Sequence, residues 1–296
     1  MANPIFPCIF VGVMEKYREL CNRLTGLYEA GEAKSIVRMV LDVRFGFSLT
    51  DVLCGRVEEL SANEKEELEK MMCRLEQGCP VQYVLGETSF FGHSFHVEPG
   101  VLIPRPETEE LVGWVASSEE LGATNGISIL DIGTGSGCIA CSLALVFPDA
   151  TVTAWDISDD ALRIARQNAE MLHADVRFVR QDALMPPEDI GQWDVIVSNP
   201  PYICRQEALA MERNVLDYEP HTALFVSDDD PLLFYRSIAR YAQKALKPGG
   251  KLFLEINPLY CRQLENMLTE MGYFAVTLRE DQSGRQRFIK ATTHED

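Results

Sequence analysis

The stretch Trp193-Asp194-Val195-Ile196-Val197-Ser198-Asn199-Pro200-Pro201-Tyr202 joins an apolar run to a rigid polar turn. The run before Asn199 predicts a buried strand over 193–198. Each proline has a fixed φ and no N–H, and each restricts the residue before it to extended backbone. The turn is therefore stiff, poor in donors and rich in free carbonyl groups. In open α/β sheets, ligands bind at the carboxyl edge, where this turn would lie.

The residues of this turn suit a planar amino group. The side-chain oxygen of Asn199 and the carbonyl oxygen of Pro200 can each accept one of its two hydrogens. Tyr202 would add an aromatic wall. A nitrogen held in this way presents its remaining face to an electrophile. The alternative is an ordinary strand-ending turn, and the turn alone does not decide between the two.

Strands and helices alternate around this turn. We expect further strands over 127–133, 151–157, 176–181 and 251–256, and helices from residue 138 and over 160–173, 231–246 and 261–271. Lys247-Pro248-Gly249-Gly250 would form the loop that closes the third of these helices. The alternation predicts a parallel, doubly wound sheet. Strands over 274–279 and 287–291 have no helix between them, so they should form an antiparallel hairpin.

Residues 1–80 are predicted to form a separate helical domain. Apolar residues recur at helical spacing over 15–30, 34–43 and 62–77, with N-cap positions at Leu49-Thr50-Asp51 and Leu60-Ser61. Acidic residues crowd the segment from Glu58 to Glu76, which is either a solvated helix face or a docking surface for a basic partner. Residues 81–106 are predicted to be a linker β-hairpin around Phe90–Phe95, and 107–296 the main domain.

The composition limits the partners of the chain. The 296 residues carry 45 acidic and 27 basic side chains, a net charge of −18. Such a chain is a poor non-specific binder of nucleic acid and suits a basic protein or a small ligand better. No apolar run approaches the roughly 18 residues that a membrane helix needs. The segment Met1–Val13 lacks a basic region and a cleavage site, so we do not expect a signal peptide there.

The cysteine pattern predicts free thiols in a reducing cytoplasm. The chain has nine cysteines, an odd number with scattered spacing, which does not suit a disulfide framework. Cys138 and Cys141 form a single CxxC, for which packing is favoured over metal or redox chemistry. His93 and His96 would face opposite sides of one strand. The sequence therefore predicts no metal site.

A glycine loop follows the first predicted strand of the main domain. Asp131-Ile132-Gly133-Thr134-Gly135-Ser136-Gly137 has three glycines that allow a tight turn and a close approach of the backbone to a ligand. The dinucleotide-binding pattern fails at Cys138, and no phosphate-binding Gly-Lys-Ser or Gly-Lys-Thr follows. The spacing instead resembles that of class I S-adenosylmethionine-dependent methyltransferases.

Two acids follow the next two strands. Asp156 would end its strand where a carboxylate can accept both ribose hydroxyls, and Asp182 would lie within reach of an adenine amino group. Either could instead be a helix cap or a salt-bridge partner. The expected cofactor site comprises Gly133, Thr134, Gly135, Ser136, Gly137, Asp156, Asp182 and Asn199.

Several motifs together resemble the HemK-type glutamine methyltransferases of peptide chain release factors, the PrmC family. They are Pro80-Val81-Gln82-Tyr83-Val84-Leu85-Gly86, Phe90-Phe91-Gly92, Val101-Leu102-Ile103-Pro104-Arg105-Pro106-Glu107-Thr108-Glu109, Asp131–Gly137, Asn199–Ile203 and Tyr218-Glu219-Pro220. The resemblance implies a Rossmann-like, seven-stranded sheet with an antiparallel terminal hairpin and S-adenosylmethionine as cofactor. It also implies that the enzyme methylates the glutamine side-chain amide in the Gly-Gly-Gln motif of class 1 release factors, which the helical domain helps to hold.

We expect catalytic roles for Asn199, Pro200 and Tyr202, with Pro201 and Arg105 joining them in substrate binding. Arg105 could position a carboxylate of substrate or cofactor, or pair with an acid in the domain interface.

The sequence departs from the family pattern at three places. Ala183 replaces a frequent aromatic over the adenine, Val226–Pro231 replaces a glycine-rich stretch, and Asn257 replaces a common glycine.

Two alternatives remain open from the sequence. A nucleic-acid amino methyltransferase could use the same turn on a flipped base, although the net charge and the absence of a basic stripe argue against it. A non-catalytic adaptor could have kept the fold, although the intact motifs argue against that. In the favoured mechanism, positioning supplies most of the rate and no general base is required before transfer.

Overall fold

The structure, a computed structural model, describes residues 14–118 and 126–294, which form two compact units. The helical unit comprises Met1–Gly86 with Arg213–Tyr218, and the sheet unit comprises Glu87–Glu212 with Glu219–Asp296. The segment Met1–Val13, including Cys8, lies outside the described residues. The domain boundaries expected from the sequence, at residues 80 and 106, stay predictions.

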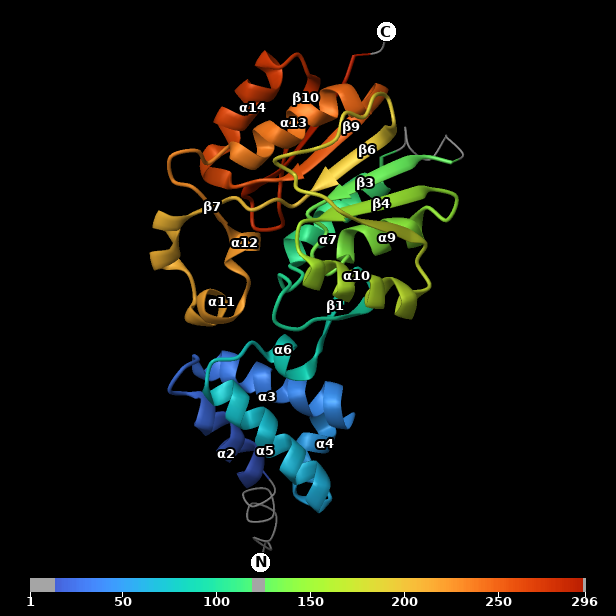
Figure 1. Cartoon of the computed structure of the whole chain (residues 1–296). Coiled ribbons are helices and arrows are strands. Elements are labelled where there is room, and N and C mark those ends of the chain that lie inside the picture. The colour runs from blue at the N-terminus through green and yellow to red at the C-terminus, as the bar shows by residue number, and fades with distance from the viewer. Residues whose placement is uncertain (1–13, 119–125, 295–296) are drawn as a thin grey trace, which may run out of the picture. The chain divides into compact units, whose positions relative to one another are not determined.

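The helical unit consists of helices (Figure 1), and their apolar side chains form its core. Its elements are α2 (Glu15–Leu24), α3 (Ala30–Phe45), α4 (Leu49–Leu53), the 3-10 helix η1 (Arg56–Glu59), α5 (Ala62–Glu76), α6 (Val81–Leu85) and α11 (Arg213–Tyr218). Fully buried side chains include Leu20, Leu24, Val37, Leu41 and Met72. The unit holds α11 partly through a hydrogen bond of 2.9 Å from the Tyr218 hydroxyl to the Gln77 carbonyl.

Serines begin two of these helices. The Ser61 hydroxyl accepts from the backbone N–H of Glu64, whose carboxylate accepts from Ser61 in return, as the sequence predicted for α5. The cap predicted within 49–51 is wrong, because Ser48 caps α4 and Asp51 is its reciprocal partner. The single helix predicted over 15–30 is also wrong, since α2 ends at Leu24 and α3 begins at Ala30.

The acidic stretch of α5 forms ion pairs inside the helical unit. Arg23 lies 2.7 Å from both Glu69 and Glu76, and Arg44 pairs with Glu67. Part of the acidic charge is therefore neutralised locally. A docking role for this surface stays a prediction.

The sheet unit contains a seven-stranded sheet in the order β10-β11-β9-β6-β3-β4-β5. Its strands are β3 (Ser128–Ile132), β4 (Thr151–Asp156), β5 (Val176–Arg180), β6 (Trp193–Ser198), β9 (Leu246–Glu255), β10 (Phe274–Glu280) and β11 (Gln286–Thr292). The first five are parallel, and β11 pairs antiparallel with both β9 and β10. The predicted doubly wound sheet with an antiparallel terminal hairpin is confirmed.

Helices cover both faces of this sheet (Figure 1). One buried cluster joins the sheet to α7 (Pro106–Ala116), α9 (Cys138–Val146) and α10 (Asp159–Leu172), and the other joins it to α13 (Leu233–Ala245) and α14 (Cys261–Glu270). Cys138 and Cys141 are buried in the first cluster, in agreement with the predicted packing role. Burial raises the pKa of the Cys141 thiol to about 12, so this thiol stays protonated near neutral pH.

Two connections differ from the sequence prediction. Lys247-Pro248-Gly249-Gly250 is not a closing loop but the irregular first half of β9, which bulges between the pairs Trp193–Leu246 and Val195–Lys251. In the predicted linker, residues 81–85 form helix α6. The hairpin that follows, β1 (Glu87–Phe90) with β2 (His93–His96), is confirmed.

The remaining short elements follow β6 and β9. They are β7 (Ile203–Cys204), the 3-10 helix η2 (Arg205–Ala210), α12 (His221–Leu224), β8 (Phe225–Val226) and the 3-10 helix η3 (Pro258–Tyr260). Within the described residues, no helix is long and apolar enough to cross a membrane.

Candidate active site

The register of the parallel strands brings the predicted site residues to one edge of the sheet. Ile132 on β3 lies opposite both Trp155 on β4 and Ser198 on β6, so Gly133, Asp156 and Asn199 follow at neighbouring points. The chain turns from β3 toward β4 on one side and later returns to place β6 on the other side. This is a topological switch point, where open α/β sheets bind their ligands.

The glycines of the loop after β3 serve two purposes. Gly133, Gly135 and Gly137 have φ values of 78°, 55° and 81°, which side chains rarely adopt. A Cβ on Gly133 or Gly135 would meet nothing within 4 Å, so these two line open space. A Cβ on Gly137 would lie 3.0 Å from the Cβ of Ala165 on α10. The first two glycines can therefore admit a ligand, and the third lets α9 pack against α10.

Hydrogen bonds hold this loop in place. The backbone N–H groups of Gly133 and Thr134 both donate to the Trp155 carbonyl at 2.9 Å. The Thr134 hydroxyl donates to Asp131 at 2.6 Å, and the Asn168 side chain donates to the Ser136 carbonyl at 2.9 Å. The loop is thus formed by the protein's own contacts, as a preorganised cofactor site requires.

Asp156 lies directly against the loop. Its carboxylate accepts from the backbone N–H groups of Gly135 and Ser158, each at 2.9 Å. Burial raises the pKa of Asp156, and these two backbone hydrogen bonds oppose the rise. Each oxygen keeps a further lone pair, so the group fits the predicted ribose contact. Asp182, after β5, accepts from Leu184 N at 2.8 Å as a local turn cap, and its adenine contact stays a prediction.

The side chain of Asn199 is fixed by Thr108 near the start of α7. Asn199 Nδ2 donates to the Thr108 hydroxyl at 3.1 Å. Within residues 14–118 and 126–294, nothing donates to Asn199 Oδ1 or to the Pro200 carbonyl oxygen. The Tyr202 carbonyl accepts from Asn257 Nδ2 at 3.1 Å. The two acceptors named from the sequence are therefore open.

A buried carboxyl group joins both ends of the turn. The Thr108 hydroxyl donates to Glu255 Oε2 at 2.7 Å, and the Tyr202 hydroxyl donates to Glu255 Oε1 at 3.0 Å. Glu255 ends β9 and is 2% exposed. Burial raises the pKa of Glu255, and the hydrogen bonds from Thr108 and Tyr202 oppose the rise. Tyr202 is thus anchored by its hydroxyl, and its contact with a substrate stays a prediction.

Arg105 forms an ion pair within the sheet unit. Its guanidinium lies 2.5 Å from Glu219, which is 4% exposed and also accepts from Ile103 N at 3.1 Å. Of the two roles open from the sequence, the acid pairing is observed, although the acid belongs to the same unit. A contact of Arg105 with substrate stays a prediction.

The sequence did not assign Thr108, Glu219, Glu255 or Asn257 to the site. Glu255 carried a signal, because it interrupts the apolar run Leu252–Ile256, and a charged residue in a buried strand needs partners. Asn257 has φ −73°, so this position does not require a glycine, and its Oδ1 accepts from Leu259 N at 3.0 Å. The substitution of the common glycine is thus compatible with the turn.

The other non-glycine stretch also closes without strain. Asp230 N donates to the Ser227 carbonyl at 3.1 Å, and Gln206 N donates to Asp228 at 3.1 Å. Within the described chain, positive φ values at non-glycine residues occur only at Phe91, His173 and Ala275. The segment from Val226 to Pro231 therefore turns without glycine, and hydrogen bonds of its polar residues hold the turn.

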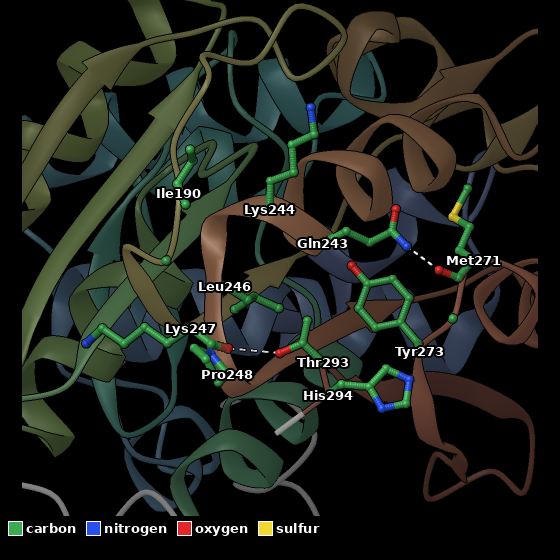
Figure 2. A pocket seen from close by; sticks show the side chains of 12 residues that line it. Ile190, Gln243, Lys244, Leu246, Lys247, Pro248, Met271, Tyr273, Thr293 and His294 are labelled. Carbon is green, nitrogen blue, oxygen red and sulfur yellow. Dashed lines mark hydrogen bonds between the residues drawn. The ribbon is translucent and has the colours of Figure 1, made fainter. Parts of the chain in front are cut away.

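A separate hollow of about 550 Å³ lies at the amino end of β9, away from the carboxyl ends of the strands that carry the site (Figure 2). Leu246, Lys247 and Pro248, at the amino end of β9, line it together with Tyr273 and Thr293. The Thr293 hydroxyl donates to the Lys247 carbonyl at 2.9 Å. Because Glu255 ends the same strand, this hollow lies at the opposite end of β9 from Asn199 and is not part of the site.

The fold and the loop after β3 place this chain among the class I S-adenosylmethionine-dependent methyltransferases. Residues 118–217 match the Methyltransferase small domain, and residues 15–86 match the PrmC N-terminal domain. A solved structure of RsmC, a 16S rRNA methyltransferase of T. thermophilus, has a TM-score of 0.50 and 21% identity, covering 70% of this chain and 50% of that one. At this identity, the likeness concerns the fold alone.

Two curated relatives are closer in sequence. The release factor glutamine methyltransferase of Bacteroides thetaiotaomicron is 45% identical over 269 residues, 90% of this chain and 95% of that protein. The one from Flavobacterium psychrophilum is 39% identical over 94% of this chain and 98% of that protein. This chain belongs to the release factor glutamine methyltransferase family, and S-adenosylmethionine is its cofactor.

Proposed function

We propose that this enzyme methylates the side-chain amide nitrogen of the glutamine in the Gly-Gly-Gln motif of a class 1 peptide chain release factor. One observation carries the proposal: Asn199 Oδ1 and the Pro200 carbonyl have no donor in the described chain, while Thr108 occupies Asn199 Nδ2. Two acceptors on consecutive residues of a stiff turn suit the two hydrogens of a carboxamide NH2.

The main contribution of the protein to catalysis is to position the amide nitrogen against the methyl donor. An amide nitrogen is a poor nucleophile, because its lone pair is delocalised into the carbonyl. The bound cofactor supplies an electrophilic methyl group on a sulfonium. Holding the nitrogen in line with it can supply about 7–11 kcal/mol of the barrier. The two acceptors also stabilise the positive charge that develops on nitrogen, and its proton leaves to solvent after transfer.

The partner and location follow from the same proposal. The release factor is a protein substrate of translation termination, and the helical unit, which matches the PrmC N-terminal domain, supports a role in holding it. We place the reaction in the cytoplasm, with the eight described cysteines as free thiols. Nucleic acid and membranes are not proposed as partners.

The direct test is transfer of label from labelled cofactor to purified release factor. We expect label in the wild-type factor and none when its loop glutamine is replaced by alanine. A parallel reaction contains ribosomal and transfer RNA. Label in RNA, with none in the release factor, would replace the proposal with a nucleic-acid amino methyltransferase.

Asn199→Ala tests the site itself. It removes one acceptor from the turn, so we expect methylation to fall by at least about a hundredfold while S-adenosylhomocysteine affinity stays within a few-fold. Calorimetry and the transfer assay measure the two quantities. Asn266→Ala, at an exposed position of α14 in the sheet unit, is the matched control with full activity. Unchanged turnover in Asn199→Ala would remove this side chain from the mechanism.

A further inference from the structure

Glu255 is a charged residue in the interior that the family motifs of the cofactor loop and the turn do not explain. It is 2% exposed and ends β9 beside the turn. A buried carboxylate costs several kcal/mol unless hydrogen bonds satisfy it. Its partners here are Thr108 and Tyr202, both in the candidate site. The carboxyl group of Glu255 is therefore bonded directly to two residues of the candidate site.

The hydrogen bonds form a chain with one direction. Thr108 has a single hydroxyl hydrogen, which it donates to Glu255 at 2.7 Å. Its oxygen can then only accept, so the Asn199 side chain must present its NH2 to Thr108, as the 3.1 Å contact shows. An amide rotated by half a turn would offer its oxygen to Thr108 and its NH2 to the substrate. That orientation would present a donor where an acceptor is needed.

Glu255 holds the far end of the turn in the same way. Tyr202 donates its hydroxyl to Glu255 Oε1 at 3.0 Å, and its carbonyl accepts from Asn257 at 3.1 Å. One carboxylate oxygen thus anchors Tyr202 directly, and the other anchors Asn199 through Thr108. Burial raises the pKa of Glu255, and Arg287, which is 14% exposed and pairs with Asp281 at 3.2 Å, opposes the rise.

We propose that Glu255 is a positioning residue for methyl transfer, which sets the orientation of the Asn199 amide through Thr108 and fixes the turn through Tyr202. The inference rests on the proposed function, because its readout is methylation of the release factor. Neither Glu255 nor Thr108 touches the reacting atoms in this scheme. Both act through the direction of the hydrogen bonds.

Three substitutions test the chain of hydrogen bonds. Glu255→Gln keeps the shape but adds an NH2 that can donate to Thr108 and reverse the direction. Thr108→Val keeps the shape and removes the hydroxyl. We expect each to lower kcat by about 10- to 100-fold, the size that a small misplacement causes, with cofactor KM within about twofold. Thr108→Ser keeps the hydroxyl and should retain kcat within about threefold of wild type. The double variant should be no slower than the slower single variant, because both changes break one chain.

Tyr241→Phe is the matched control. It removes a tyrosine-to-carboxylate hydrogen bond of the same kind, from Tyr241 to Asp189 at 2.6 Å, and the bond that the same hydroxyl accepts from Trp193 Nε1 at 2.8 Å. Both bonds lie away from the turn, because Trp193 begins β6 and the turn follows its other end. We expect full kcat from it, so loss of a buried hydrogen bond alone does not explain a slow variant. If Glu255→Gln fails to fold, the contrast between Thr108→Val and Thr108→Ser decides the question.

The outcomes separate the two proposals. Absence of methylation by the wild type would overturn the proposed function. A wild type and Tyr241→Phe that methylate, together with Glu255→Gln and Thr108→Val at full kcat, would overturn the positioning role alone. Equal losses in Thr108→Ser and Thr108→Val would also overturn it, since the hydroxyl would then have no effect.

Discussion

Asp131 lies directly beneath the glycine loop and has no exposed surface. The Thr134 hydroxyl donates to its Oδ2 at 2.6 Å, and its Oδ1 has no partner in the described part of the chain. Burial raises the pKa of Asp131 to about 7. A carboxyl group that is charged in the unfolded chain but resists ionisation in the folded state makes stability depend on pH.

Asp131→Asn should reveal this dependence. Because the folded pKa is raised, the stabilising contribution of Asp131 is complete below about pH 4 and is lost as pH rises through about 7. We expect the free energy of unfolding of the wild type, minus that of the variant, to fall by a few kcal/mol between these values. Urea unfolding at a series of pH values measures it, with Asp149→Asn at an exposed turn as control. A difference that does not change with pH would contradict the prediction.

At the scale of elements, the start of α9 couples the cofactor loop to helix packing. Gly133 and Gly137 have nearly the same φ, 78° and 81°, but only a Cβ on Gly137 would collide with α10. A side chain at either position would therefore be strained by the positive φ, but only a side chain at Gly137 would also overlap another helix. The pair separates the packing role of the loop from its binding role.

Gly137→Ala should destabilise the protein more than Gly133→Ala. Both changes cost about 1–2 kcal/mol of backbone strain, and Gly137→Ala adds an overlap of the new methyl with Ala165 at 3.0 Å. Gly133→Ala should instead weaken S-adenosylhomocysteine binding, because its methyl enters open space beside the loop. Thermal unfolding and calorimetry measure the two effects. Equal losses of stability, with equal affinity, would contradict this division.

The sequence pattern predicted strands and helices correctly where neighbouring residues alone determine the structure of a segment. The start of α9 at Cys138 follows from the glycine loop, and Ser61 begins α5 because its side chain reaches the backbone three residues on. The predicted loop at Lys247–Gly250 was wrong because the flanking residues Leu246 and Lys251 both pair with β6. Backbone hydrogen bonds also join Gly249 and Gly250 to His294 and Thr293, just after β11. Proline and glycine in this segment indicated an irregular backbone, but they did not indicate that the irregularity lies within a strand.

The candidate site divides in the same way. Acids after strands, such as Asp156, and the turn at Asn199 can be placed on one edge from the order of elements. The contacts of Thr108 could not be predicted, since Asn199 and Glu255 lie 91 and 147 residues away in sequence. Only the register of β6 and β9 and the position of α7 bring them together. The residues proposed to contact the ligands could therefore be named from the sequence, and the groups that orient them could not.

At the scale of the whole molecule, two units with separate cores share one chain. The chain leaves the helical unit after Gly86, returns for Arg213–Tyr218, and leaves again before Glu219. All three tryptophans, Trp114, Trp155 and Trp193, belong to the sheet unit, whereas both units contain helices. Tryptophan fluorescence thus reports on the unit with the cofactor site, and circular dichroism reports on both.

Cofactor product should stabilise the two units unequally. S-Adenosylhomocysteine at a hundred times its Kd adds about 2.7 kcal/mol to a unit that binds it only when folded. For a unit of this size that raises Tm by roughly 5–10 °C. We expect this shift in tryptophan fluorescence, while part of the helical circular dichroism signal melts at an unchanged temperature. Asp156→Ala, which removes the proposed ribose contact, should lose the shift at the same concentration. Identical shifts by both probes would show instead that the helical unit unfolds together with the sheet, so that cofactor binding also stabilises the part proposed to hold the release factor.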